Sequence, residues 1–190
     1  MDIKAIVYNS SAGTTRRYAE QLAEWTGLPA VPLKKARKEL AGQPVVFMSW
    51  ICSGVLMYGE RAKRLFDLKC ICAVGIGTEE QARRDLKTQH ELEGEHLFFL
   101  PGAFQMRKVK FLHRRLMKDM LLALRAKKAD KSREFTKADQ ESYHMLRYGA
   151  DKYSEAALEA VRDRLNRGVC DRLSAGGQDA HTVYHSFPHS

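Results

Sequence analysis

The N-terminal segment reads Ile3-Lys4-Ala5-Ile6-Val7-Tyr8-Asn9-Ser10-Ser11-Ala12-Gly13-Thr14-Thr15 and continues into Arg16-Arg17-Tyr18-Ala19-Glu20. Its apolar run predicts a strand, and the small hydroxyl residues around Gly13 predict a tight loop. A helical pattern of apolar residues begins directly afterwards. The N-terminus of a helix offers unpaired amide groups and the positive end of the helix dipole, and nearby hydroxyls add further donors. The segment therefore predicts an anion site whose natural ligand is a phosphate.

The hydroxyl loop, residues 10–15, also has a simpler interpretation, because Ser and Thr in front of a helix are common N-caps. We favour the phosphate site because four hydroxyl residues and a glycine exceed what one cap requires. Other phosphate motifs are excluded. A Walker loop would continue with Gly-Lys-Ser/Thr, and a Rossmann fingerprint would have three glycines where this loop has one.

The chain has 190 residues, which is enough for one domain with its own hydrophobic core. No apolar run in the sequence approaches membrane-spanning length, and the N-terminus lacks the layout of a signal peptide. The four cysteines have no metal-ligand spacing. We therefore expect no metal site and a protein of the reducing cytoplasm.

Most of the net charge of +9 lies in residues 107–128, where nine Lys or Arg residues accompany one acidic residue, Asp119. Apolar residues recur there at helical spacing, which predicts one long amphipathic helix from Arg107 to Lys128 with an unusually wide apolar side. Such a concentration of positive charge indicates an acidic partner surface, whether lipid, nucleic acid or protein. A simpler interpretation is a helix that packs its apolar side on the sheet and exposes its basic side to solvent. The one-sided surplus of positive charge disfavours this interpretation.

Apolar runs alternate with helical patterns along the chain in the order β-α-β-α-β-α-β-α-β-α. We expect further strands at 30–33, 45–48, 70–77 and 97–100, and further helices at 34–40, 58–67, 78–92, 107–128 and 136–166, the last of which Gly149 could break. Because the strands are apolar throughout instead of alternating, both faces of the sheet should be covered, which predicts a parallel sheet with helices on each side. Ligands of such folds lie beyond the carboxyl ends of the strands, where the hydroxyl loop, the segment after Trp50 and the turn at Gly77 should meet.

The sequence Ser10-Ser11-Ala12-Gly13-Thr14-Thr15 resembles the phosphate loop of the flavodoxin-like FMN proteins, which reads Ser/Thr-x-Thr-Gly-x-Thr directly after the first strand. Ala12 departs from this pattern, since it lacks the hydroxyl of the middle Thr but keeps the backbone amide. The chain is more closely similar to the branch that includes the menaquinone-dependent protoporphyrinogen dehydrogenases. In that branch a Gly after the last strand precedes a long basic amphipathic helix, and Gly102-Ala103-Phe104 with residues 110–118 match this feature.

The resemblance implies an α/β fold with a flavodoxin-like, doubly wound sheet of five parallel strands in the order 2-1-3-4-5. The domain would span residues 1–167, with the basic helix 107–128 as an insertion after the last strand and residues 168–190 as a poorly ordered tail. The implied cofactor is FMN, surrounded by Ser10, Ser11, Ala12, Gly13, Thr14, Thr15, Trp50, Ile51, Cys52, Ser53, Gly54, Gly75, Gly77 and Thr78.

Within this implied site the hydroxyl loop would hold the phosphate. The segment from Trp50 to Gly54 would border the flavin ring, and the two later glycines with Thr78 would form its other edge. The dehydrogenase branch has an aromatic and a basic residue in the loop after the third strand. Here Trp50 supplies the aromatic residue, but no basic residue follows before Gly54. We assign no general acid or base, because the cofactor carries the redox chemistry.

The implied function is an FMN-dependent oxidoreductase that passes electrons from an organic substrate through FMN to a quinone. Two alternatives remain: a flavodoxin-type electron carrier without its own substrate, and a basic nucleic-acid-binding module. The basic residues match no known readout motif for nucleic acid. Expected partners are a quinone or a redox protein, and an anionic membrane surface bound through residues 107–128, which would hold a cytoplasmic protein at the inner face of the membrane.

Overall fold

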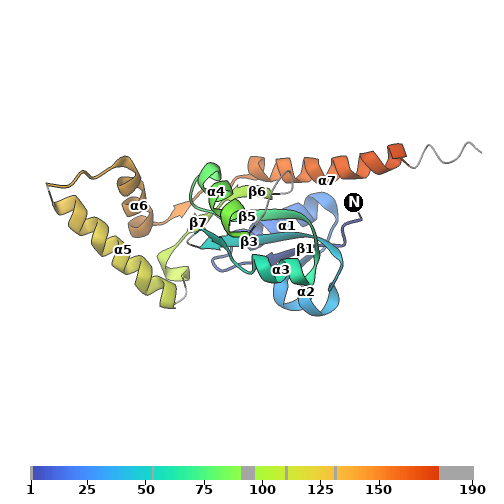
Figure 1. The fold of residues 1–190 in the computed structure, drawn as a ribbon, viewed down its shortest axis with the longest axis horizontal. Coiled ribbons are helices and arrows are strands. Elements are labelled where there is room, and N and C mark those ends of the chain that lie inside the picture. Colours follow the sequence, from blue (N-terminus) through green and yellow to red (C-terminus); the bar gives the residue numbers. More distant parts are fainter. Residues whose placement is uncertain (1, 53, 91–96, 110, 131, 176–190) are drawn as a thin grey trace, which may run out of the picture.

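The computed structural model describes residues 2–52, 54–90, 97–109, 111–130 and 132–175. Figure 1 shows a central sheet flanked by helices, with two further helices extending from one end. The strands are β1 (Ala5–Asn9), β2 (Ala30–Pro32), β3 (Pro44–Cys52), β4 (Val55–Leu56), β5 (Asp67–Gly75), β6 (Leu97–Pro101), β7 (Ala103–Phe104) and β8 (Ala150–Asp151). The helices are α1 (Thr14–Thr26), α2 (Leu33–Glu39), α3 (Gly59–Leu65), α4 (Glu79–His90), the 3-10 turn η1 (Met106–Lys108), α5 (Phe111–Ala129), α6 (Lys137–Tyr148) and α7 (Glu155–Ala175).

The main sheet is parallel along the path β2-β1-β3-β5-β6. Its registers place apolar residues side by side, for example Val7 beside Phe47 and Phe47 beside Ile71. The predicted α/β fold with a mostly parallel sheet is therefore confirmed. The sheet has one strand more than the five predicted, because β4 pairs antiparallel with the end of β3.

The predicted loop at residues 50–54 is wrong for its first part, because β3 continues to Cys52 and pairs with β4 as an antiparallel hairpin. Gly54 follows with a φ of 78°, a left-handed conformation that a tight reversal requires and that glycine adopts without strain. Ser53, which belongs to the predicted site, lies outside the described residues. The segment that leads away from the sheet is thus fixed by strand pairing.

Helices cover both faces of the main sheet, as predicted. On one face α1 and α7 bury Tyr18 and Leu158 against β1 and β3. On the other face α2, α3 and α4 bury Ala36, Ala62 and Leu86. Burial of a large apolar side chain stabilises a fold by about 1.5–3 kcal/mol. These two layers hold the strand ends that carry the candidate site.

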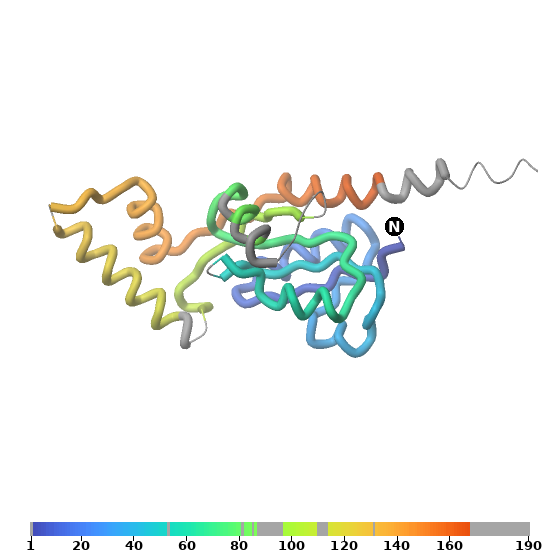
Figure 2. Tube along the Cα trace, in the orientation of Figure 1, coloured from blue at the N-terminus to red at the C-terminus, as the bar shows by residue number. Residues whose placement is uncertain are grey.

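The two helices α5 and α6 form a helical hairpin, residues 111–148, that stands away from the sheet. The chain leaves the sheet after β6 and returns before α7 at nearly the same place (Figure 2), where β7 pairs antiparallel with β8. Gly149 has a φ of +86°, and a Cβ there would lie 2.9 Å from the carbonyl oxygen of Phe104. Glycine at this position therefore allows β7 and β8 to pair at the base of the helical hairpin.

Contacts between α5 and α6 fix the helical hairpin internally. The ammonium group of Lys127 donates to the carboxylate of Asp139 at 2.6 Å. The same carboxylate accepts from the amide of Thr136, and the Thr136 hydroxyl accepts from the amide of Asp139, which forms a capping box at the start of α6. The hydrogen bonds from Lys127 and Thr136 lower the pKa of Asp139 to about 2.

Two helix predictions differ from the structure, and one is confirmed. The basic helix expected at 107–128 is divided into η1 and α5, whereas the break that Gly149 suggested in the helix expected at 136–166 is present. The last helix runs on to Ala175, beyond its expected end, and residues 176–190 of the predicted tail lie outside the described residues. None of the described helices combines the length and the apolar character that crossing a membrane requires.

Candidate functional site

The hydroxyl loop joins β1 to α1 at the carboxyl edge of the sheet. Gly13 precedes the helix with a φ of 104°, a conformation that L side chains rarely adopt, and its amide donates to the Ser10 hydroxyl at 3.2 Å. Within the described chain no side chain caps α1, and its first turn contains no acidic residue. The first amides of α1 are therefore available to an anion, and the helix dipole favours negative charge there.

Hydrogen bonds lock the ends of β1 and β3 beside each other. The side-chain amide of Asn9 donates to the buried hydroxyl of Ser49 at 3.1 Å, and this hydroxyl donates to the carbonyl of Met57 at 2.6 Å. The amide of Met57 in turn donates to the carbonyl of Trp50. Trp50 is consequently held at the sheet edge by strand and hairpin hydrogen bonds.

Two glycines let the ends of β5 and β6 approach closely. A Cβ at Gly75 would lie 2.9 Å from the ring of Phe99 and 3.1 Å from the side chain of Ile51. A Cβ at Gly102 would lie 3.0 Å from the carbonyl oxygen of Gly75, which accepts a hydrogen bond from the Gly102 amide. A larger residue at Gly102 would press on the backbone of Gly75, and a larger residue at Gly75 would displace the side chains of Phe99 and Ile51.

A cavity of about 420 Å³ lies where these segments meet. The sheet side is formed by Ser11, Ala12, Thr14, Thr15, Trp50, Ile51, Cys52, Val74, Gly75, Ile76, Gly102 and Ala103. The structure thus brings eight of the predicted site residues together around one space. Ser10, Gly13 and Gly54 are not among its described lining residues, although the first two shape the loop.

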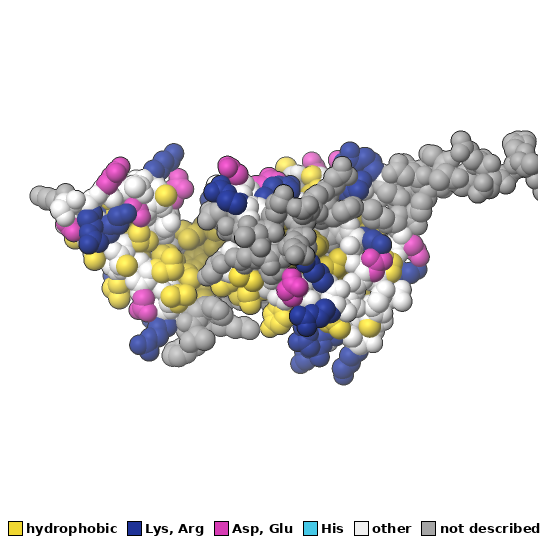
Figure 3. All heavy atoms as spheres, viewed as in Figure 1, with side chains coloured by type: hydrophobic (Ala, Val, Ile, Leu, Met, Phe, Trp, Pro, Cys, Tyr) yellow, Lys and Arg dark blue, Asp and Glu magenta, His cyan; other side chains and the backbone are white. Residues whose placement is uncertain are grey.

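We call this cavity the first cavity. Its other wall comes from the helical hairpin and from the segment that leads into it, and the sequence analysis did not predict this wall. It consists of Phe104, Gln105, Lys108, Val109, Met117, Met120, Ser142, Met145 and Leu146. Figure 3 shows apolar side chains gathered between the helical hairpin and the sheet. The unusually wide apolar side of residues 107–128 was the signal in the sequence, since packing on a sheet alone does not need it.

A second cavity of about 790 Å³ adjoins the first, and both are lined by Ile76, Ser142 and Met145. Gly77 and Thr78, predicted to border a flavin ring, line this second cavity and not the first. Its remaining polar lining includes Lys137, Gln140, Glu141, His144 and Lys152. The predicted site is therefore divided between two neighbouring spaces.

Tyr18 connects the elements that surround the site. Its buried hydroxyl donates to the carbonyl of Pro101 at 2.7 Å and accepts from the amide of Ser154 at 2.9 Å, so it ties α1 to the end of β6 and the start of α7. Burial raises the pKa of Tyr18 to about 12. The guanidinium of Arg17 stacks 3.5 Å above the ring of Tyr153, which itself packs on Tyr18. Arg17 thus stabilises the pair of tyrosines that connects these elements.

The three cysteines whose side chains the structure describes add no second site. Cys70 and Cys72 are buried in the sheet with their sulfur atoms 4.0 Å apart, and the hydrogen bond between them and their burial raise the pKa of Cys72. Cys52 is partly exposed at the first cavity. In the described part of the chain, no three His, Cys, Asp or Glu side chains are grouped in a way that could hold a metal ion.

No family model matches the chain, and neither a curated protein nor a solved structure matches it. The site is therefore interpreted from its residues and geometry.

Proposed function

We propose that this protein is an FMN-dependent oxidoreductase with a flavodoxin-like fold, which passes electrons from an organic substrate to a quinone. The observation that carries the proposal is the first cavity, which joins the uncapped start of α1 to the carboxyl ends of β3 and β5. The parallel path β2-β1-β3-β5-β6 supports the proposal, because without the short strand β4 it is compatible with the order 2-1-3-4-5 of flavodoxin-like sheets. Ligands of such sheets bind at this edge.

The donors around the hydroxyl loop fit a phosphate group. Thr14 and Thr15 open α1 and line the cavity together with Ser11, so hydroxyls and backbone amides converge there. Such groups can satisfy phosphate oxygens without a Lys or Arg. This agrees with the positions of Arg16 and Arg17, of which the first pairs with Glu20 at 2.6 Å and the second stacks on Tyr153.

The remainder of the first cavity fits a flat apolar ring. Trp50 and Ile51 line the cavity from β3, and Gly75 and Gly102 line it at the ends of β5 and β6 without side chains of their own. Bound FMN would supply the electron-transfer chemistry. The residues of this chain would bind it, orient its ring and exclude water, and the helical hairpin would supply much of the exclusion.

The helical hairpin also favours an enzyme over a simple carrier. An electron carrier needs an exposed cofactor edge for protein partners, whereas here Met117 and Met145 face the sheet across the first cavity. A covered apolar space beside a cofactor site suits a small organic reactant.

The decisive experiment is to load the purified protein with FMN and with riboflavin, which lacks the phosphate. We expect FMN absorbance to remain with the protein after gel filtration. We also expect FMN to bind roughly a hundredfold more tightly than riboflavin, since each charge-assisted hydrogen bond is worth about 1.5–3 kcal/mol. Failure to bind either flavin would overturn the proposal. Equal affinity for both would contradict the role of the hydroxyl loop.

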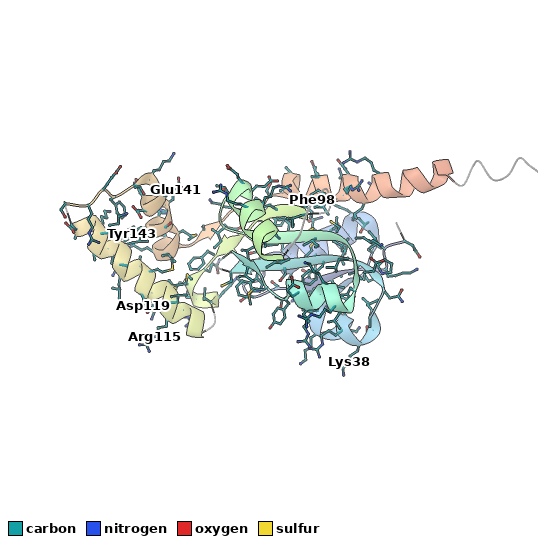
Figure 4. The ribbon with its side chains drawn as sticks, in the orientation of Figure 1. Lys38, Phe98, Arg115, Asp119, Glu141 and Tyr143 are labelled. Carbon is teal, nitrogen blue, oxygen red and sulfur yellow. The ribbon has the colours of Figure 1, made fainter. Side chains whose placement is uncertain are left out.

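We further infer that α5 binds an anionic membrane surface, which would bring the site close to a membrane-dissolved quinone. Leu116, Met120 and Leu122 are about half exposed on this helix, and Arg115 and Lys118 are exposed among them. Arg115 points away from the sheet (Figure 4). A helix that combines exposed apolar and basic residues suits the interface of an anionic bilayer.

Vesicle sedimentation tests this inference. We expect the protein to sediment with vesicles that contain phosphatidylglycerol and not with pure phosphatidylcholine. The double variant Arg115→Glu/Lys118→Glu should bind at least about tenfold more weakly, because each basic residue near an anionic surface contributes about 1 kcal/mol. The control Lys34→Glu/Lys38→Glu makes the same charge change on exposed positions of α2, far from the helical hairpin (Figure 4). An equal loss in both variants would indicate net charge alone and contradict docking through α5.

A further inference from the structure

A second concentration of positive charge lies on the face of the sheet that α2 and α3 cover. These two helices contain seven Lys or Arg residues and two acidic residues. They bury side chains in the same core cluster, and the amide of Gly42, just after α2, donates to the carbonyl of Leu65 at the end of α3 at 2.7 Å. Figure 3 shows dark blue side chains gathered over these helices at the lower edge of the molecule. Such a basic surface attracts an acidic partner.

Part of this basic surface lines a pocket of about 450 Å³, which we call the Tyr58 pocket. Its apolar lining includes Val55 and Tyr58, which are 37% and 45% exposed, and the buried Leu56. Arg61 and Arg64 line the pocket as well, and both are exposed. Tyrosine and arginine are enriched at the centres of protein–protein interfaces. The Tyr58 pocket therefore has the composition of a site for a protein partner.

The two arginines of the Tyr58 pocket are available to carboxylates. Among the described residues, neither Arg61 nor Arg64 has an ion-pair partner. Glu60 is the one acidic side chain found among the described residues that line the pocket, and it pairs with Lys63 at 3.4 Å. A segment that combines carboxylates with an apolar side chain matches both parts of this lining. The phosphate backbone of a nucleic acid would match the arginines alone.

The backbone of Tyr58 is strained. Its φ is 63°, and it is the one non-glycine residue with a positive φ in the described part of the chain. This left-handed conformation is unfavourable for a residue with a side chain, whereas glycine adopts it freely. Burial offsets the strain only in part, because the side chain remains 45% exposed. A strained, exposed aromatic residue beside a pocket indicates a role in binding.

The β3–β4 hairpin separates the Tyr58 pocket from the first cavity. Val55 of the pocket pairs with Cys52, and Leu56 pairs with Ile51. Both of these β3 residues line the first cavity. The two spaces share no lining residue among those described. A partner in the Tyr58 pocket would thus lie next to the candidate site without entering it.

We propose that the Tyr58 pocket is the docking site for an acidic segment of a partner protein. The segment inserts one apolar side chain between Val55 and Tyr58, and its carboxylates pair with Arg61 and Arg64. The other basic residues of α2 and α3 attract the segment and help to set its orientation. The inference concerns the binding of a partner beside the candidate site and does not rest on the proposed function.

Calorimetric titration of the full chain tests the proposal. The probe is an acetylated and amidated peptide in which one leucine is flanked on both sides by Asp and Glu. We expect saturable binding at low ionic strength that weakens as salt is added. A control peptide with serine in place of the leucine should bind at least about tenfold more weakly, because it has no apolar side chain to bury. Absence of binding by the leucine peptide, or equal binding of both peptides, would overturn the proposal.

Two matched charge reversals locate the binding site. Arg61→Glu/Arg64→Glu should weaken peptide binding at least about tenfold, because two attractive charges become repulsive. Arg115→Glu/Lys118→Glu makes the same change in net charge at exposed positions of α5, where screening by salt should keep peptide binding within about twofold of wild type. Equal losses in both variants would show that net charge alone attracts the peptide, which would contradict docking at the Tyr58 pocket.

The variant Tyr58→Gly separates binding from folding. Glycine suits a φ of 63°, so the melting temperature should not fall. Peptide binding should weaken at least about tenfold, because the aromatic side chain of the pocket is lost. Thermal melting and the same titration measure the two effects. Wild-type affinity for the peptide, or a clear fall in melting temperature, would mean that the ring serves packing instead of docking, and the proposal would be wrong.

Competition distinguishes a protein partner from a nucleic acid. A single-stranded oligothymidylate at the same concentration should not displace the leucine peptide, because its phosphates do not fill the apolar part of the Tyr58 pocket. Displacement by the oligonucleotide, together with loss of oligonucleotide binding in Arg61→Glu/Arg64→Glu, would assign this surface to nucleic acid and refute the docking of an acidic protein segment.

Discussion

Replacement of Thr14 by glutamate is expected to weaken FMN binding at least about a hundredfold without loss of stability. Thr14 is the first residue of α1 and lines the first cavity, so a carboxylate there would face the proposed phosphate. Two unit charges about 4 Å apart repel by roughly 4 kcal/mol at an effective dielectric constant near 20. The same carboxylate interacts favourably with the helix dipole, by about 0.3–1 kcal/mol, because the first turn of α1 has no acidic residue.

The matched control is Thr14→Gln, which has nearly the size of glutamate without its charge. Its affinity for FMN should fall far less, and riboflavin should bind both variants about equally, because riboflavin has no phosphate to repel. Fluorescence titration with the two flavins measures the affinities, and thermal melting measures stability. Wild-type affinity for FMN in Thr14→Glu would show that the phosphate lies elsewhere.

Replacement of Tyr18 by phenylalanine is expected to destabilise the fold by about 2 kcal/mol. The ring would still fill its place in the core, but the carbonyl of Pro101 and the amide of Ser154 would lose their buried partner. An unsatisfied buried polar group costs about 1–3 kcal/mol. For a chain of this length we expect Tm to fall by roughly 4–8 °C. Tyr148→Phe, at an exposed tyrosine of α6, should leave Tm unchanged.

The pH dependence of stability gives a second measure of Tyr18. Its pKa is about 12 in the folded protein and near 10 in the unfolded chain, so between these values the unfolded state releases a proton that the folded state keeps. Stability is therefore full below pH 10 and falls as the pH rises toward 12. Urea unfolding at pH 8 and pH 11 should show a smaller loss for Tyr18→Phe than for wild type. Equal losses would contradict the role given to this hydroxyl.

The layered fold could be predicted because long apolar strands and amphipathic helices carry their signals locally. The run around Val7 and the break at Gly149 are examples, and both are read from a few neighbouring residues. The hydroxyl loop was likewise predictable, since a glycine among hydroxyl residues between a strand and a helix is a local sequence pattern. Its ligand remains a proposal.

The elements that the sequence did not predict depend on distant partners. Strands β4, β7 and β8 have two residues each, too few for any periodicity, and β7 forms only because Phe104 meets Ala150. The wall of the first cavity depends on the same pairing, because it brings Met117 and Met145 back over the sheet. The wide apolar side of the basic helix indicated that something must cover it, without indicating what.

The closure of the helical hairpin at β7 and β8 makes this part of the chain a separable module. Among the described residues, neither of the two buried core clusters contains a residue of α5 or α6, and Phe104 and Ala150 are paired neighbours. A short turn between these two residues would leave a complete α/β body with the hydroxyl loop intact. Ligand preference could consequently diverge by exchange of one module, at little cost to the folding of the remainder.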